Sequence, residues 1–248
     1  MMIRLFDLQF ARLKRQKIIY LFFAVMTALI LSNALSCAGG SEDAGMGYYA
    51  GGRFPTMCMQ SYIDIVGTLF LGFISAVLIC GERANGMFRQ PLLNGVSKRQ
   101  LLLAKTGSIF AVSLICFMFV VVCSIGTGFF FWGNRIFAHA REYCLQMGLL
   151  LFPQTTLVLF FVFLSLHMSS ISGMLCASLI ILLVNNLFSQ FFGAYLSYFD
   201  FMYYLYAFSG YNGAALTGKM IASGLLVNLI TGTMLIYGIR RRTDRMIL

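Results

Sequence analysis

The chain has 248 residues, of which 60% are hydrophobic and 10% are charged, and its net charge is +10. An ordinary soluble domain is about 25% charged. A soluble core could not bury this much apolar surface, so the sequence excludes a conventional soluble enzyme and predicts a protein whose main solvent is lipid.

The first predicted element is an amphipathic helix over residues 1–17. Ile3, Phe6, Phe10 and Leu13 fall on one helical face, and most of the charged side chains fall off it. A basic helix with one apolar face is typical of a segment that lies in the cytoplasmic membrane interface. A solvated N-terminal arm is the alternative.

Six apolar runs are long enough to cross a bilayer, because a span needs roughly 20 mostly apolar residues. The runs are continuous and lack the two-residue alternation of a barrel strand, so helices are indicated. We therefore expect an all-α membrane protein with one membrane domain, residues 18–239, and a basic tail, residues 240–248. The six spans are 18–36, 58–80, 106–131, 145–167, 173–192 and 218–239.

The end of the first run faintly suggests a lipoprotein signal, because Ala34-Leu35-Ser36-Cys37 follows the apolar stretch. That stretch is longer than a signal core of about 7–15 residues, and Leu35 is a poor fit. An uncleaved first helix is favoured. Cys37 and Cys58 both fall near the outer face, where a disulfide is one interpretation and free thiols are the favoured one.

The charges are distributed unequally between the loops. If the N-terminus, the 81–105 loop and the C-terminal tail share one side, that side has fourteen basic and three acidic residues, and the other has four basic and five acidic ones. The positive-inside rule then places both termini in the cytoplasm, which requires an even number of spans. This distribution argues against a nucleic-acid partner and for a multi-pass membrane protein.

Residues 193–217, between the fifth and sixth spans, contain nine aromatic residues and one charge, Asp200. A seventh span here would place Arg240, Arg241 and Arg242 outside, against the charge rule. We expect instead a pair of short re-entrant helices that pack against protein or line a cavity.

Residues 213–220, GAALTGKM, nearly match a phosphate-binding loop, with Gly213, Gly218 and Lys219 at the required spacing. Met220 replaces the hydroxyl that holds magnesium, and no strand precedes the motif. Thr217 is better interpreted as the N-cap of the last helix. We expect no cofactor and no ATP site in this chain.

No catalytic or metal-binding constellation is present. His139 and His167 have no cysteine, serine or carboxylate partner at useful spacing, and few acidic residues share a membrane face. The ionisable and polar residues within spans are instead candidates for a substrate path. They are Asp64 in the second span and Asn185, Asn186, Ser189 and Gln190 in the fifth; helix–helix hydrogen bonding is the alternative role.

The loop after the second span carries the most informative pattern. Glu82 and Arg83 follow the span directly, then come Gly86, Arg89, Asn94-Gly95-Val96-Ser97-Lys98-Arg99, Leu101-Leu102 and Lys105. This resembles the cytoplasmic loop of ABC-type exporter permeases, the bacitracin, lantibiotic-immunity and sodium-extrusion class. It departs from that pattern at Met87, where Thr is usual, and at Lys98, which is inserted between Ser97 and Arg99.

The resemblance implies a membrane subunit of an ATP-driven exporter. A short coupling helix from about Asn85 to Leu93 would seat in a separate ATPase, which would hold the ATP and magnesium. Glu82 and Arg89 would be available for ion pairs with it. The implied coupling residues are Glu82, Arg83, Gly86, Arg89, Ser97, Arg99 and Lys105.

The resemblance also implies a second permease copy or related subunit, with spans 2 and 5 flanking the path of an amphipathic peptide, antimicrobial or drug. A non-transporting scaffold or sensor that anchors partner proteins is the alternative. An ion-motive carrier would need more buried ionisable residues than Asp64.

Overall fold

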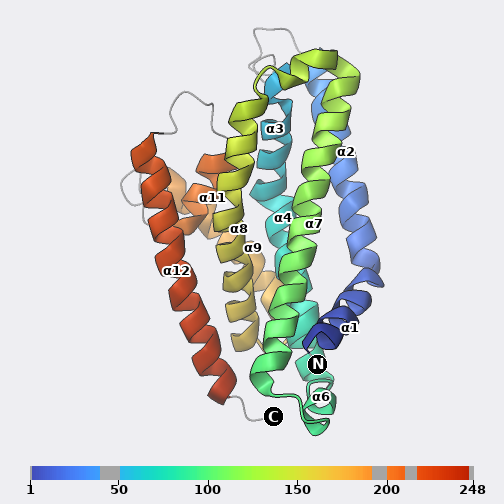
Figure 1. Ribbon diagram of the computed structural model, residues 1–248, viewed down its shortest axis with the longest axis vertical. Helices are drawn as coiled ribbons and strands as arrows, with labels where there is room; N and C mark the ends of the chain where they lie inside the picture. The colour runs from blue at the N-terminus through green and yellow to red at the C-terminus, as the bar shows by residue number, and fades with distance from the viewer. Residues whose placement is uncertain (1, 40–50, 192–199, 210–216, 246–248) are drawn as a thin grey trace.

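The computed structural model describes residues 2–39, 51–191, 200–209 and 217–245, and these residues form helices joined by short turns, with no strand among them. Figure 1 shows long helices standing roughly side by side, with α2 (Lys17–Gly39) at one flank and α12 (Gly218–Arg245) at the other. The all-α fold expected from the sequence is confirmed.

Five helical segments in the described part of the chain are long and apolar enough to cross a membrane. They are Lys17–Gly39, Phe54–Ala84, Lys98–Phe137, Ala140–His167 and Gly218–Arg245. The expected fifth span corresponds to α9 (Ile171–Phe191), whose described side chains form a shorter apolar helix, Ile171–Val184. Five of the six expected spans therefore have a matching helix, and the exact six-span topology stays a prediction.

The second span is the centre of the bundle and is not a uniform α-helix. It consists of α3 (Phe54–Ser61), a π-helical segment η4 (Tyr62–Val66), α4 (Gly67–Ser75), a second π-helical segment η5 (Ala76–Gly81) and α5 (Glu82–Ala84). Buried residues make up 67% of its most apolar window, against 11% for α12. The Thr68 hydroxyl of α4 donates to the carbonyl of Ile63 in η4 at 2.9 Å, five residues back. Such π segments are frequent at functional sites.

The third span, α7 (Lys98–Trp132), begins eight residues earlier than expected. Ser97 Oγ accepts from the Gln100 amide at 3.3 Å, and the Gln100 side chain accepts from the Ser97 amide at 3.3 Å. This capping box starts the helix at the end of the loop. Lys98, Arg99 and Lys105 therefore lie on the first two turns of α7, and placing them in an 81–105 loop was wrong. The turn η6 (Gly133–Phe137) then leads to α8 (Ala140–His167).

The N-terminal residues form the expected helix, α1 (Met2–Lys14), which ends at a turn before α2. Its apolar face packs on α7: Leu13 is buried, and the Phe6 ring lies 3.6 Å from where a Cβ of Gly107 would stand. Figure 1 shows α1 bent away from α2 at the end of the molecule that also holds α6 (Arg89–Leu93) and the end of α12. We call this the basic end, because it holds Arg12 of α1, Lys98 and Arg99 at the start of α7, and Arg240 and Arg242 at the end of α12.

The aromatic segment between the last two spans contains one described helix, α11 (Phe201–Ser209). Tyr204 and Phe208 are fully buried, and the Tyr204 hydroxyl donates to Ser223 Oγ of α12 at 3.0 Å. Nine residues rise only about 13 Å, less than half of a roughly 30 Å bilayer core. A short helix packed against protein fits the expected re-entrant segment. The second short helix that we expect here would fall on residues 192–199 or 210–216, which lie outside the described residues.

Candidate coupling site at the basic end

A buried ion pair joins the end of the second span to the start of the third. Lys105 Nζ lies 2.5 Å from Glu82 Oε2 and donates to the carbonyl of Leu78 at 2.8 Å. The Lys105 side chain is 0% exposed and that of Glu82 is 11% exposed. Burying both charges is costly unless they are paired, so this contact fixes the position of α7 against η5 and α5.

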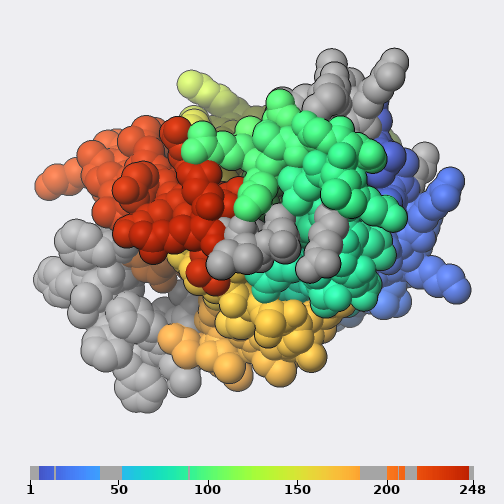
Figure 2. Space-filling view, turned by 90° about the horizontal axis from the view of Figure 1, so that it is seen from below, coloured from blue at the N-terminus to red at the C-terminus, as the bar shows by residue number. Residues whose placement is uncertain are grey.

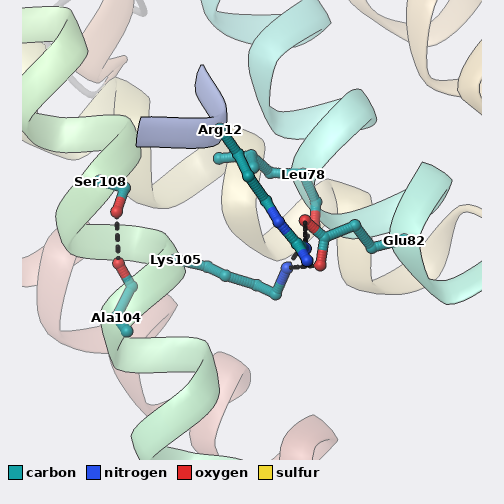
Figure 3. A network of polar contacts seen from close by, with 6 residues as sticks. All are labelled: Arg12, Leu78, Glu82, Ala104, Lys105 and Ser108. Atoms are coloured by element: carbon teal, nitrogen blue, oxygen red, sulfur yellow. Dashed lines mark hydrogen bonds and ion pairs between the residues drawn. The ribbon is translucent and has the colours of Figure 1, made fainter. Parts of the chain in front are cut away.

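Two further side chains close around this pair. Arg12 of α1 lies with Nη1 3.6 Å from Glu82 Oε1, and the Phe88 ring centroid lies 4.6 Å from Lys105 Nζ. Figure 3 shows the Arg12 and Lys105 side chains converging on the Glu82 carboxylate from two different helices. We call Arg12, Glu82, Phe88 and Lys105 the charge cluster. It ties α1, α5, α7 and the loop after α5 together at one point.

The loop between α5 and α7 leaves this cluster and turns twice. Gly86 has a φ of +68° and Gly95 a φ of +79°, a backbone conformation that favours glycine. Between them stands α6, only five residues long. It begins at Arg89, and not at Asn85 as expected, because the chain turns at Gly86 with the Met87 amide donating to the Glu82 carbonyl at 2.9 Å.

The loop has buried anchors and an exposed tip. Phe88 and Val96 are buried, whereas the Leu93 side chain is 85% exposed and that of Met87 is 39% exposed. In Figure 1 α6 lies at the extreme basic end of the molecule, beyond the ends of the long helices. Two large apolar side chains are thus presented on a loop that the charge cluster holds in place.

Two more contacts connect this region to other helices. The Arg83 guanidinium donates to the carbonyl of Leu166 at the end of α8, at 3.1 Å, and to that of Met168, the residue that follows α8. Arg99 forms a two-point pair with Asp244 at the end of α12, with distances of 3.0 and 2.8 Å. In Figure 2, which views this end directly, residues of α12 (red) lie beside those at the start of α7 (green).

The structure therefore brings most of the expected coupling residues together, but with different contacts. Glu82 is inside the molecule and paired, so the expectation that it is free for a partner's charge was wrong. Arg83 and Arg99 also bind within the chain. The backbone of Arg89 begins α6, and its side chain lies outside the described residues. Gly86 and Ser97 have backbone roles, as a turn and a helix cap.

Sequence reasoning missed three residues of this site. Arg12 was assigned to an interfacial helix without a partner, and neither Phe88 nor Leu93 was given a role of its own. One available signal was the S-x-x-Q pattern of residues 97–100, which predicts a helix start and so places Lys105 two turns into α7.

Comparison with known proteins gives the family. The model of the ABC-2 family transporter proteins matches residues 5–185, which is more than half of the chain. The chain belongs to this family. No curated protein matches it. An ABC-2 permease is a multi-pass membrane subunit of an ABC transporter, associates with an ATPase subunit and is not itself catalytic.

The candidate path residues of this permease are only partly described. Asp64 lies in the π segment η4 and is half-buried. Asn185, Asn186, Ser189 and Gln190 continue the backbone of α9, and their side chains lie outside the described residues.

A buried polar group that the sequence did not reveal lies near η4. The Gln154 amide of α8 donates to the Tyr62 hydroxyl at 3.1 Å and to Ser113 Oγ of α7 at 2.8 Å. All three side chains are buried, so these contacts hold spans 2, 3 and 4 together.

Three smaller expectations have outcomes here. All seven cysteines are free, including Cys37 and Cys58. Residues 213–216 of the apparent phosphate loop lie outside the described residues, but Thr217 directly precedes α12 and its carbonyl accepts from Met220 at 2.9 Å, as a helix start does. His139 does have a carboxylate partner, Glu142 at 3.3 Å, so expecting none was wrong; both side chains are exposed at the start of α8.

Proposed function

We propose that this permease belongs to an ATP-driven exporter and moves an amphipathic substrate, such as a peptide, an antimicrobial or a lipid-like drug, out of a bacterial cell. The basic end faces the cytoplasm, because the positive-inside rule favours that side for its arginines and lysines. A separate cytoplasmic ATPase binds there with its ATP and magnesium, and two permease copies, or this chain and a related subunit, face each other in the membrane.

The observation that carries this proposal is the exposed apolar tip on an anchored loop. Leu93 is 85% exposed at the extreme basic end, where lipid tails would not cover it. Exposed apolar groups of this kind mark interaction sites when they gather on one surface, and Met87 is exposed on the same loop. Leu93 and Met87 would fill a groove of the ATPase. A movement of the ATPase would then shift the loop, and the charge cluster would pass that shift to the helices it joins.

A push on this loop has a defined route into the membrane. Glu82 contacts α1 through Arg12 and α7 through Lys105, and Arg83 contacts the end of α8. A movement of the loop would therefore be transmitted to these three helices. Rigid-body movement of helices is one of the ways in which a membrane protein can alternate between inward-open and outward-open states. The two π segments of the second span are the places where that helix would change shape. Asp64 in η4, with Asn185, Asn186, Ser189 and Gln190 on α9, would line the path between copies.

Lysine at position 93 should uncouple the two subunits. We expect Leu93→Lys to weaken ATPase binding at least tenfold, because it would place a charge where an apolar anchor is proposed, and loss of a hot-spot contact costs about 2 kcal/mol or more. Stimulation of ATP hydrolysis by the permease, measured in reconstituted liposomes with the co-purifying ATPase, should fall accordingly. Phe137→Lys is the matched control, since Phe137 is 50% exposed at the opposite end.

Two results would count against the proposal. Stimulation of hydrolysis that survives Leu93→Lys would remove the loop from the interface. If no ATPase co-purifies and hydrolysis never responds to the chain, a scaffold or sensor that anchors partner proteins becomes the better account.

A further inference from the structure

An apolar groove lies between α7, α8 and α12 at the basic end, apart from the charge cluster. Its volume is about 300 Å³, and its walls are aliphatic side chains from the three helices: Leu102, Leu103, Leu159, Ile236 and Ile239. A cavity of this volume lies at the lower end of the range for ligand sites.

The groove opens toward the bilayer. Leu103 is 58% exposed and Ile236 is 54% exposed, and both belong to helices that cross the membrane. The surface of α12 that continues from the groove is apolar as well: Leu229, two turns before Ile236 on the same helical face, is 68% exposed. A ligand that reaches the groove through this surface must be apolar along most of its length.

The mouth of the groove is basic. Arg99 and Arg240 line it, at the level where the apolar part of both helices ends. Asp244 neutralises Arg99, whereas Arg240 is exposed and has no hydrogen-bonded partner among the described residues. Arg241 and Arg242 follow directly on α12, so the net charge around the mouth is positive. The complementary ligand has an acyl chain and an anionic head.

We propose that this groove binds an anionic phospholipid of the leaflet at the basic end. One acyl chain lies between Leu103 and Ile236, and the phosphate lies against Arg240 and Arg99. Basic pockets between membrane helices favour anionic headgroups for this electrostatic reason. The lipid would bridge α12 to α7 at the place where Arg99 and Asp244 already join them.

Native mass spectrometry of the full chain in detergent tests this proposal. The chain is titrated with phosphatidylglycerol or with phosphatidylcholine of the same acyl chains. We expect phosphatidylglycerol to bind more tightly, and Arg240→Gln to weaken it about fivefold. Leu103→Trp, which fills the groove, should weaken the binding of both lipids. Lys219→Gln at the far end of α12 and Met118→Trp on exposed α7 are the controls and should change neither.

Several outcomes would overturn the proposal. Equal affinity for the two lipids would show that the site does not recognise the anionic headgroup. Unchanged binding in both Arg240→Gln and Leu103→Trp would show that the lipid binds elsewhere. Full competition by glycerol 3-phosphate would show that the site takes a phosphate without a chain. If deleting residues 246–248 raises lipid binding several-fold, the chain's own end is the occupant.

Discussion

Replacing Glu82 with alanine should destabilise the permease by about 3–5 kcal/mol, the range for removing one partner of a buried ion pair. Lys105 would be left in a site with 0% exposure, with only the Leu78 carbonyl and the Phe88 ring for partners. At roughly 2–4 °C per kcal/mol for a chain of this size, the midpoint of thermal unfolding in detergent should fall by on the order of 10 °C.

The double variant Glu82→Ala/Lys105→Met distinguishes the cost of an unpaired lysine charge from the cost of losing side-chain volume. Methionine fills much of the lysine volume without a charge, so the double variant should recover most of the lost stability. Arg12→Ala should cost no more than about 1 kcal/mol, because Arg12 is 46% exposed and 3.6 Å from the carboxylate. If the single and double variants unfold at the same temperature, the lysine is not held by Glu82 as described.

The second large effect is expected at Gly72, where α4 packs directly against Ser178 of α9. A Cβ on Gly72 would overlap Ser178 Oγ and stand 3.0 Å from Ser178 Cβ. Small residues allow such close helix approach in membranes. Gly72→Leu should therefore push the two helices apart and cost at least 1–3 kcal/mol, as overpacked cores do, again measured as a fall in the unfolding midpoint.

A matched glycine and a compensating change make this result specific. Gly148 of α8 has no atom within 4 Å of its own Cβ position, so Gly148→Leu should leave the midpoint nearly unchanged. The double variant Gly72→Ala/Ser178→Gly moves the small residue from α4 to α9. It should recover most of the stability that Gly72→Ala alone loses. Additive effects of the two substitutions would contradict a direct contact between them.

The sequence predicts the broad architecture of this permease because its signals are local. Continuous apolar runs identify the five matching helices, and the spacing of Ile3, Phe6, Phe10 and Leu13 identifies α1. Thr217 marks the start of α12 because a capping residue precedes an apolar run.

The contacts of the coupling site depend on segments far apart in the chain, and no local pattern contains them. Glu82 meets Arg12, which is 70 residues earlier, and Lys105 from the next helix. Local charge counting leaves Glu82 on a loop surface, whereas packing of α1 and α7 buries it. The π segments of the second span were likewise not predicted, because apart from Asp64 the residues of Tyr62–Val66 are those of an ordinary membrane helix, and composition does not distinguish a π turn from an α turn.

Photo-crosslinking at position 93 tests whether the loop between α5 and α7 contacts the ATPase. A benzoyl-phenylalanine is placed at Leu93, and at Phe137 as the control, in cells that also produce the partner ATPase. Ultraviolet light should join the ATPase to the chain carrying the probe at position 93 and leave the position-137 chain unmodified. An adduct at position 137 with none at position 93 would contradict the proposal that the ATPase binds the loop between α5 and α7.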